Sequence, residues 1–135
     1  MERSIEILTA LSLGIFGLSH LLQPRVWVRF FIDLREKGEP GVFTVAFMHL
    51  PFGLFILAFH RVWTGIPLVV TLLGCAWTFK GTLYFCFPAI GLRGMGMVSL
   101  ERLYFFRVGG VALILLGGVI GYSLLTSMPP FPLGR

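Results

Sequence analysis

The stretch VFTVAFMHLPFGLFILAF at residues 42–59 decides the fold. It contains no Asp, Glu, Lys or Arg, and it is long enough for a membrane-spanning helix, which needs about 17–25 residues. Its apolar residues run continuously, without the polar alternation that is typical of a membrane strand. The stretch therefore predicts a membrane helix, and Pro51 interrupts it near the middle, two residues after His49.

Three further apolar runs lie on either side of this stretch, at residues 5–22, 66–87 and 103–125. The whole chain of 135 residues is 56% hydrophobic and 13% charged, whereas soluble domains are about 25% charged. The length fits one domain, residues 1–135. The prediction is an all-α fold, an integral membrane four-helix bundle. Because the first run carries Glu2 and Glu6 and lacks a small-residue cleavage site, we expect a retained helix rather than a signal peptide.

The connection between the first two predicted spans has a helical pattern of its own, at residues 25–36. Trp27 and Phe30 fall on an apolar face, and Arg29 and Asp33 lie on the opposite side as an i,i+4 charge pair. This pattern is typical of an amphipathic helix lying in the membrane interface. A simple joining role and a gating or docking role both remain open for it.

Basic residues divide unequally between the two ends of the predicted bundle, eight against three. The smaller group is Arg3, Arg61 and Arg135, near the termini and the middle connection. The larger group comprises Arg25, Arg29, Arg35, Lys37, Lys80, Arg93, Arg102 and Arg107. Positive residues stay cytoplasmic, so the prediction is a plasma-membrane protein, of a bacterial inner membrane, with both termini outside. The net charge of +5 indicates attraction to anionic lipid headgroups and gives no reason to propose nucleic acid.

Three ionisable side chains fall at one depth in the predicted spans. His49, Lys80 and Arg107 each lie eight residues from the cytoplasmic end of their segment, about 12 Å below the boundary. His20 lies closer to that boundary in the same half. Ionisable groups in hydrocarbon usually face the bundle interior or water. We therefore expect a shared ligand site, to which Tyr84 contributes from the face of Lys80.

Helical spacing also predicts how these side chains are held. Trp77 shares a face with Lys80 and is expected to hold the ammonium by a cation–π contact. On the last span, Arg107 shares a stripe with three glycines, which predicts that this stripe packs on another helix. The three predicted packing glycines are Gly110, Gly117 and Gly121.

Pro51 gives the predicted site its shape. The proline lacks an N–H and crowds the carbonyl of Phe47, so a kink is expected there, made easier by Gly53. The carbonyl that is freed in lipid needs a new partner. The prediction is a small polar cavity near His49, open to the cytoplasm, for a lipid phosphate, a carboxylate or a quinone carbonyl. The alternative is structural: the charges extend toward the interface, and His49 bonds a backbone carbonyl.

No catalytic or metal-binding residue is predicted, and no cofactor is indicated. His49 and His60 are about 16 Å apart along one helix, too far for a shared ion. Cys75 and Cys86 are too far apart to pair and are expected to be packing residues. An enzyme with His20 or His49 as acid–base residue would need a carboxylate or metal partner, which the sequence does not supply, so the balance is against one. An outer interfacial belt is expected from His60, Arg61, Trp63 and Thr64.

A partial duplication relates the first and third spans. Gly14, His20 and Pro24 precede one basic connection, and Gly74, Lys80 and Pro88 precede another. This pattern predicts two helical hairpins arranged as parallel repeats, as in some transporters.

The segment LSLGIFGLSHLLQP at residues 11–24 resembles the first helix of DoxX-like small membrane proteins, and CAWTFKGTLYFCFP at 75–88 resembles their third. Several members of that family are associated with redox or quinone-linked partners. The resemblance implies an accessory or scaffolding subunit of a membrane complex, in a homo-oligomer or with a larger membrane protein. The alternative function is a lipid-, quinone- or small-anion-binding protein or transporter that uses the polar pocket.

Overall fold

The computed structural model describes residues 1–127, and within them it is built of helices without strands. The elements are α1 (Glu2–Leu22), α2 (Pro24–Glu36), α3 (Glu39–Phe59), α4 (Leu68–Cys86), α5 (Pro88–Met95), the 3-10 turn η1 (Leu100–Arg102) and α6 (Leu103–Thr126). The tail from 128 to 135, with Arg135, lies outside the described residues.

Four of these helices, α1, α3, α4 and α6, are long and apolar enough to cross a membrane. They match the four predicted spans, with ends that differ by at most three residues. α5 is a helix that the sequence analysis missed, because Gly91 and Gly94 give this segment a low helix propensity. Tertiary packing compensates for that low propensity: Gly91 is buried where a side chain would collide with Val42 and Tyr84.

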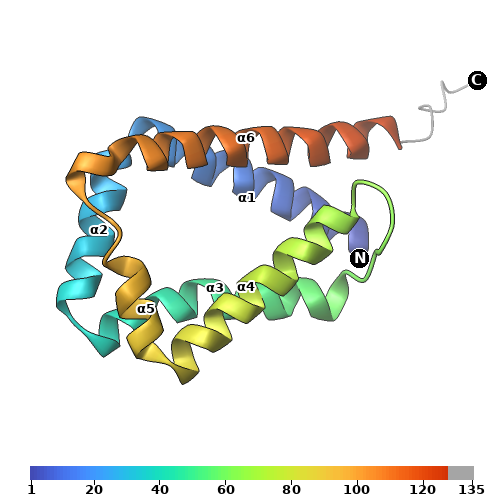
Figure 1. Cartoon of the computed structure of the whole chain (residues 1–135). Coiled ribbons are helices and arrows are strands. Elements are labelled where there is room, and N and C mark those ends of the chain that lie inside the picture. The colour runs from blue at the N-terminus through green and yellow to red at the C-terminus, as the bar shows by residue number, and fades with distance from the viewer. Residues whose placement is uncertain (128–135) are drawn as a thin grey trace, which may run out of the picture.

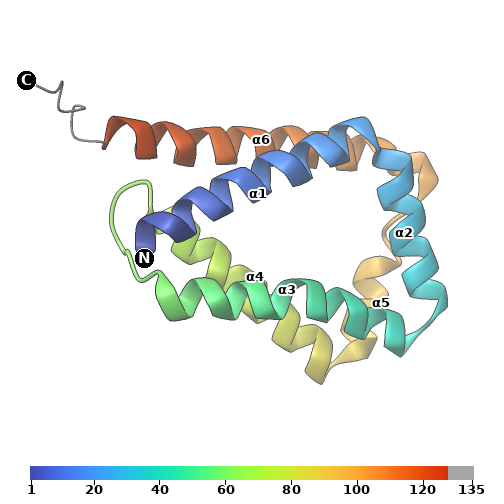
Figure 2. The same cartoon turned by 180° about the vertical axis from the view of Figure 1, so that it is seen from behind.

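The long helices form two pairs, because α1 packs along α6 and α3 packs along α4 (Figure 1). The two pairs approach each other near the N-terminus and the loop at 60–67, and they diverge toward α2 and α5 (Figures 1 and 2). α2 bridges the wide end and contacts α3, α6 and α5. The predicted hairpins, of the first span with the second and of the third with the fourth, are therefore wrong, because α1 pairs with α6 and α3 pairs with α4.

Glycines set the close approach of α1 and α6. A Cβ at Gly110 would lie 2.6 Å from the carbonyl oxygen of Gly17, and one at Gly117 would lie 2.8 Å from that of Ala10. Small residues at such positions let two helix backbones pack directly. The predicted packing role fits Gly110 and Gly117, but a Cβ at Gly121 would meet no atom of residues 1–127 within 4 Å.

The same contacts recur in the other pair, 64 residues along the chain. Gly81, which lies 64 positions after Gly17, packs against Leu50, just as Gly17 packs against Ile114. The equivalent positions are Ala10 and Gly74, Gly14 and Thr78, Gly17 and Gly81, Pro24 and Pro88, Leu50 and Ile114, and Gly53 and Gly117. The chain is therefore two tandem halves, in which α1 corresponds to α4, α2 to α5 and α3 to α6.

This offset of 64 residues between equivalent positions, the tandem register, corrects the duplication predicted from the sequence. Alignment of His20 with Lys80 is four residues out, about one helical turn. In the structural register His20 corresponds to Tyr84, and Lys80 corresponds to Phe16. Pro24 and Pro88 keep their match, and each begins a short helix.

Two buried apolar clusters hold the helices together, one at each end of the molecule. One joins all four long helices near the N-terminal end and consists of Ile5, Leu13, Ile56, Val70, Ile120 and Leu124. The other joins α2, α3 and α5 at the wide end and consists of Leu34, Val42, Val45 and Met95.

The apolar face of α2 packs on protein. Trp27 and Phe31 lie against α1 and α6, and Val28 and Leu34 are buried. The sequence analysis placed this face in the bilayer; it turns inward because the diverging helix pairs leave apolar walls to be covered. Opposite it, Arg29 and Asp33 are exposed, and the ion pairs of residues 1–127 do not include them.

Candidate functional site

A cavity of about 230 Å³ lies between the two helix pairs, somewhat smaller than the roughly 300–1,000 Å³ of typical ligand pockets. α1, α2 and α3 supply most of its wall, and α4 and α6 supply one residue each. Its lining consists of Ile5, Leu8, Thr9, Ser12, Leu13, Phe16, His20, Trp27, Phe31, Met48, His49, Phe52, Phe55, Ile56, Trp77 and Leu113. The lining is mainly apolar and aromatic, and its polar side chains are Thr9, Ser12, His20 and His49.

His49 enters this wall from the middle of α3, and its hydrogen bonds define its protonation pattern. The Nδ1 nitrogen lies 2.7 Å from the carbonyl oxygen of Val45, so Nδ1–H is the donor. The Nε2 nitrogen is then an acceptor, and the Lys80 ammonium donates to it over 3.1 Å. His49 is therefore a neutral imidazole between a backbone carbonyl and a cation.

Lys80 stands behind His49 and is not itself among the lining residues. Its ammonium lies 5.6 Å from the centre of the Tyr84 ring. The cation–π partner is therefore Tyr84 rather than the predicted Trp77, which lines the cavity instead. An ammonium has three donors, and His49 takes one of them, which leaves Lys80 able to donate again.

His20 is a second polar side chain in the cavity wall. It lies near the C-terminal end of α1, which is the end predicted to face the cytoplasm. Its Nδ1 nitrogen lies 2.7 Å from the carbonyl oxygen of Phe16. The ring is stacked between Trp27, with centroids 4.3 Å apart, and Phe106, at 5.6 Å. Trp27 is held in turn by an Nε1–H bond of 2.9 Å to Ser19 Oγ. With Nδ1–H donated, the Nε2 of His20 is an acceptor.

Arg107 does not join these groups. It is exposed on α6 beside Val108, Val111 and Leu115, on a face away from the cavity. The predicted meeting of three ionisable groups therefore holds for Lys80 and His49 alone.

The kink predicted at Pro51 and Gly53 stays a prediction, and the structure adds a packing role for Gly53. α3 continues through Pro51 to Phe59, and Pro51 is exposed. Gly53 is buried where a Cβ would collide with the Thr78 backbone and lie 2.9 Å from the Gly74 carbonyl oxygen. Its place in the structure is close packing of α3 on α4.

The tandem register shows what the other half of the chain places at these positions. His49 corresponds to Leu113, and Lys80 corresponds to Phe16. Leu113 and Phe16 both line the same cavity. An apolar pair therefore serves for packing in the α1–α6 pair, at the place where the α3–α4 pair carries an imidazole and an ammonium.

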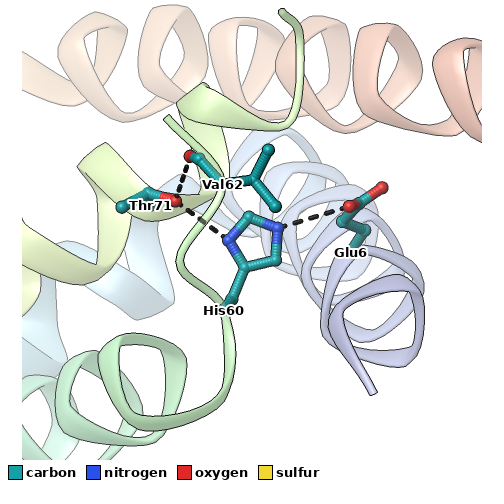
Figure 3. A network of polar contacts seen from close by, with 4 residues as sticks. All are labelled: Glu6, His60, Val62 and Thr71. Carbon is teal, nitrogen blue, oxygen red and sulfur yellow. Dashed lines mark hydrogen bonds and ion pairs between the residues drawn. The ribbon is translucent and has the colours of Figure 1, made fainter. Parts of the chain in front are cut away.

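A second polar cluster, missed by the sequence analysis, lies at the narrow end (Figure 3). His60 is 0% exposed, so its assignment to an outer interfacial belt is wrong. It contacts Thr71 and, across to α1, the carboxylate of Glu6. Glu6 was noted only as an argument against a signal peptide. An acidic residue inside an apolar run, at the same end as a histidine, was the available signal.

Within residues 1–127 no group of three His, Cys, Asp or Glu is placed to hold a metal ion. Cys75 is half-buried and Cys86 is exposed, and both are free thiols. Comparison with protein-family models gave no match, and neither did comparison with curated proteins or with solved structures.

Proposed function

We propose that the protein is an integral membrane protein in which α1, α3, α4 and α6 cross the bilayer. Large apolar side chains on the outer surfaces support this proposal, among them Ile15, Phe47, Phe79 and Leu115, each at least 64% exposed. Apolar surface that is this extensive needs lipid or protein around it. The end with α2 and α5 carries most basic residues and is assigned to the cytoplasm.

Within that setting we propose that the cavity binds a lipid-soluble ligand with a flat, uncharged polar head, and a quinone fits best. The observation that carries this proposal is the wall itself: aromatic rings surround most of the space, and two histidines approach it. The aromatic lining residues are Phe16, Trp27, Phe31, Phe52, Phe55 and Trp77. A planar ring packs well against such side chains through offset and edge-to-face contacts.

The polar groups suit a head with oxygen atoms. Lys80 lies outside the lining, and its hydrogen bond to Nε2 holds the His49 ring in its place in the wall. His20 offers an acceptor nitrogen, which suits a hydroxyl such as that of the reduced quinone. A free inorganic anion fits less well, because the apolar wall cannot replace its hydration shell.

Tryptophan fluorescence tests this proposal, because quinones quench indole emission on contact. Trp27 and Trp77 line the cavity, whereas Trp63 is exposed in the loop between α3 and α4. In the Trp63→Phe protein, in nanodiscs, a short-chain benzoquinone should quench the remaining emission saturably. The double change His49→Leu with Lys80→Phe, which copies Leu113 and Phe16, should weaken binding at least tenfold.

Partitioning of the quinone into lipid is the control. It produces quenching that rises linearly with concentration and is the same in both proteins. A linear response in the parent protein, or a saturable one that the double change does not weaken, would refute the quinone site.

A second candidate function is an accessory subunit, as the DoxX-like resemblance implies. The observation that favours it is on α6, where Cβ atoms at Gly118 and Gly121 would meet no atom of residues 1–127 within 4 Å. Small residues on a lipid-facing surface allow another helix to approach. Native mass spectrometry of protein extracted with its lipid tests this candidate. A second polypeptide at fixed ratio, lost in Gly118→Leu, is the expected result.

A further inference from the structure

The two helix pairs are joined at their narrow end by one buried polar network (Figure 3). His60, at the end of α3, lies 3.0 Å through Nδ1 from Thr71 Oγ1 on α4 and 3.3 Å through Nε2 from Glu6 Oε1 on α1. The Thr71 hydroxyl also lies 2.7 Å from the Val62 carbonyl oxygen. The contact with Glu6 is the one that crosses between the pairs.

The number of protons in this network follows from its donors and acceptors. The Val62 carbonyl has no proton, so the Thr71 hydroxyl donates its single hydrogen there. The contact between Thr71 and His60 must then use a hydrogen on Nδ1. A neutral imidazole has only that one hydrogen, so its Nε2 would present a lone pair to the carboxylate of Glu6. Two acceptors at 3.3 Å repel, and the contact requires one more proton.

We propose that Glu6 and His60 form a proton-binding site, and that the bound proton ties α1 to the α3–α4 pair. The proton resides between His60 Nε2 and Glu6 Oε1, as an imidazolium–carboxylate pair or as a protonated carboxyl that donates to the neutral ring. Without it, the two side chains repel and the narrow end loses this polar contact between the helix pairs. This site is separate from the cavity and does not depend on the proposed quinone.

Within residues 1–127, the other charged groups near this end do not replace the proton. The Arg3 guanidinium bonds the Leu124 carbonyl oxygen on α6, and Arg61 bonds that of Leu57 on α3. Glu2 is exposed at the start of α1. From α4 the group that faces His60 is the Thr71 hydroxyl, which does not ionise between about pH 5 and pH 8. Glu6 is thus the charged partner of His60.

The tandem register argues that packing alone does not require these polar groups. Glu6 corresponds to Val70, and His60 corresponds to Leu124. Val70 and Leu124 are buried members of the apolar cluster at this same narrow end. A buried ionisable pair is usually no more stabilising than a well-packed apolar one, so its retention here indicates a task beyond packing.

The consequence reaches the cavity through α1. Ile5 and Thr9, which line the cavity, flank Glu6 on that helix. A change in the spacing of the pairs at Glu6 therefore moves one wall of the cavity. Because the joined state binds a proton that the separated state does not, it gains population as pH falls.

Distance measurement in nanodiscs tests the proposal. Spin labels at Ser4→Cys and Leu72→Cys, both exposed, report the separation of α1 from α4 in a Cys75→Ser, Cys86→Ser background. Between about pH 5 and pH 8, the range in which histidine commonly titrates, the distribution should shift from one short distance to longer ones. The shift should follow the binding of one proton.

The matched control is Glu6→Gln. The glutamine amide can donate to the His60 Nε2 lone pair, so it makes the same contact without an added proton. This variant should keep the short distance throughout the range. A parent distribution that does not change with pH, or an equal shift in Glu6→Gln, would overturn the proposal.

Nitrogen NMR of His60 provides a second, independent readout in the full chain. In the joined state, one possible result is that both ring nitrogens carry hydrogen. The other is that Nδ1 alone carries hydrogen; the proton is then on Glu6, and the parent protein shows an infrared band of a protonated carboxyl that is lost in Glu6→Gln. A neutral ring protonated only at Nε2 beside an ionised Glu6 contradicts the proton count and overturns the assignment.

Discussion

Lys80 and His49 can be replaced by Phe and Leu, the residues at the equivalent positions of the other half of the chain. This replacement distinguishes a role of the pair in packing from a role in ligand binding. His49→Leu leaves the Lys80 ammonium without its acceptor, at a cost of about 1.5–3 kcal/mol for a hydrogen bond to a charged group. Lys80→Phe leaves the His49 Nε2 acceptor unpaired, at a cost of about 1–3 kcal/mol. The double variant removes both partners and copies a pair, Leu113 and Phe16, that already packs in the other half of this chain. It should cost less than about 1 kcal/mol, because exchange of both partners for apolar groups is often nearly neutral.

The measurement is a double-mutant cycle on the free energy of unfolding, from denaturation in mixed micelles with increasing SDS. The single changes sum to about 2.5–6 kcal/mol, so a near-neutral double variant implies a coupling of at least about 1.5 kcal/mol. Additive losses, with the double variant as unstable as that sum, would refute the reasoning and also the tandem register on which it rests. Quinone binding measured on the stable double variant then reports recognition without a folding defect.

Three further predictions follow from packing and exposure. Gly117→Ala should destabilise the protein by about 1–3 kcal/mol, because its Cβ meets the backbone of α1. Gly118→Ala has open space around it and should be neutral, or slightly stabilising through helix propensity. Unfolding in SDS compares the two variants, and equal losses would refute the helix contact. Thr78→Val should stabilise by about 1 kcal/mol, because the buried Thr78 hydroxyl has no hydrogen-bond partner among residues 1–127; a loss of stability in the same assay would show that the hydroxyl is satisfied. Cys86, exposed at the basic end of α4, should react with a membrane-impermeant maleimide from the cytoplasmic side alone in a Cys75→Ser protein; labelling of intact cells from outside would reverse the assigned orientation.

Sequence periodicity was sufficient for the long helices because their signal is local. The run at 42–59 carries enough apolar residues to identify α3 with no knowledge of its neighbours. α5 could not be found in this way, since its glycines disfavour a helix and its stability comes from contacts with Val42 and Tyr84. Which helices pair was also beyond local patterns, because α1 meets α6 from the far end of the chain.

The candidate site was partly visible in the sequence through depth. Equal distance from the helix ends brought Lys80 and His49 together correctly, but depth along a helix does not give direction around it. Arg107 has the same depth and faces outward. The pairing of Glu6 with His60 was hidden for a different reason: its members are 54 residues apart, and the belt pattern around His60 resembles an exposed loop.

The tandem register adds information that neither depth nor burial supplies. The two halves of the chain pack in the same way, so each residue can be compared with its equivalent in the other half. At most equivalent positions both halves use small or apolar residues, as at Gly53 and Gly117. Two of the departures form contacting polar pairs: Lys80 with His49 beside the cavity, and Glu6 with His60 at the narrow end.

These departures lie on opposite sides of the same space and differ in what they demand. The ammonium of Lys80 keeps a neutral His49 in place in the cavity wall, and this arrangement needs no added proton. Glu6 and His60 cannot keep their contact without gaining a proton. The first pair alone gives no reason for the spacing of the helix pairs to depend on pH. With both, the spacing of the helix pairs, and so the wall of the cavity at Ile5, responds to protons at the end opposite the basic helices.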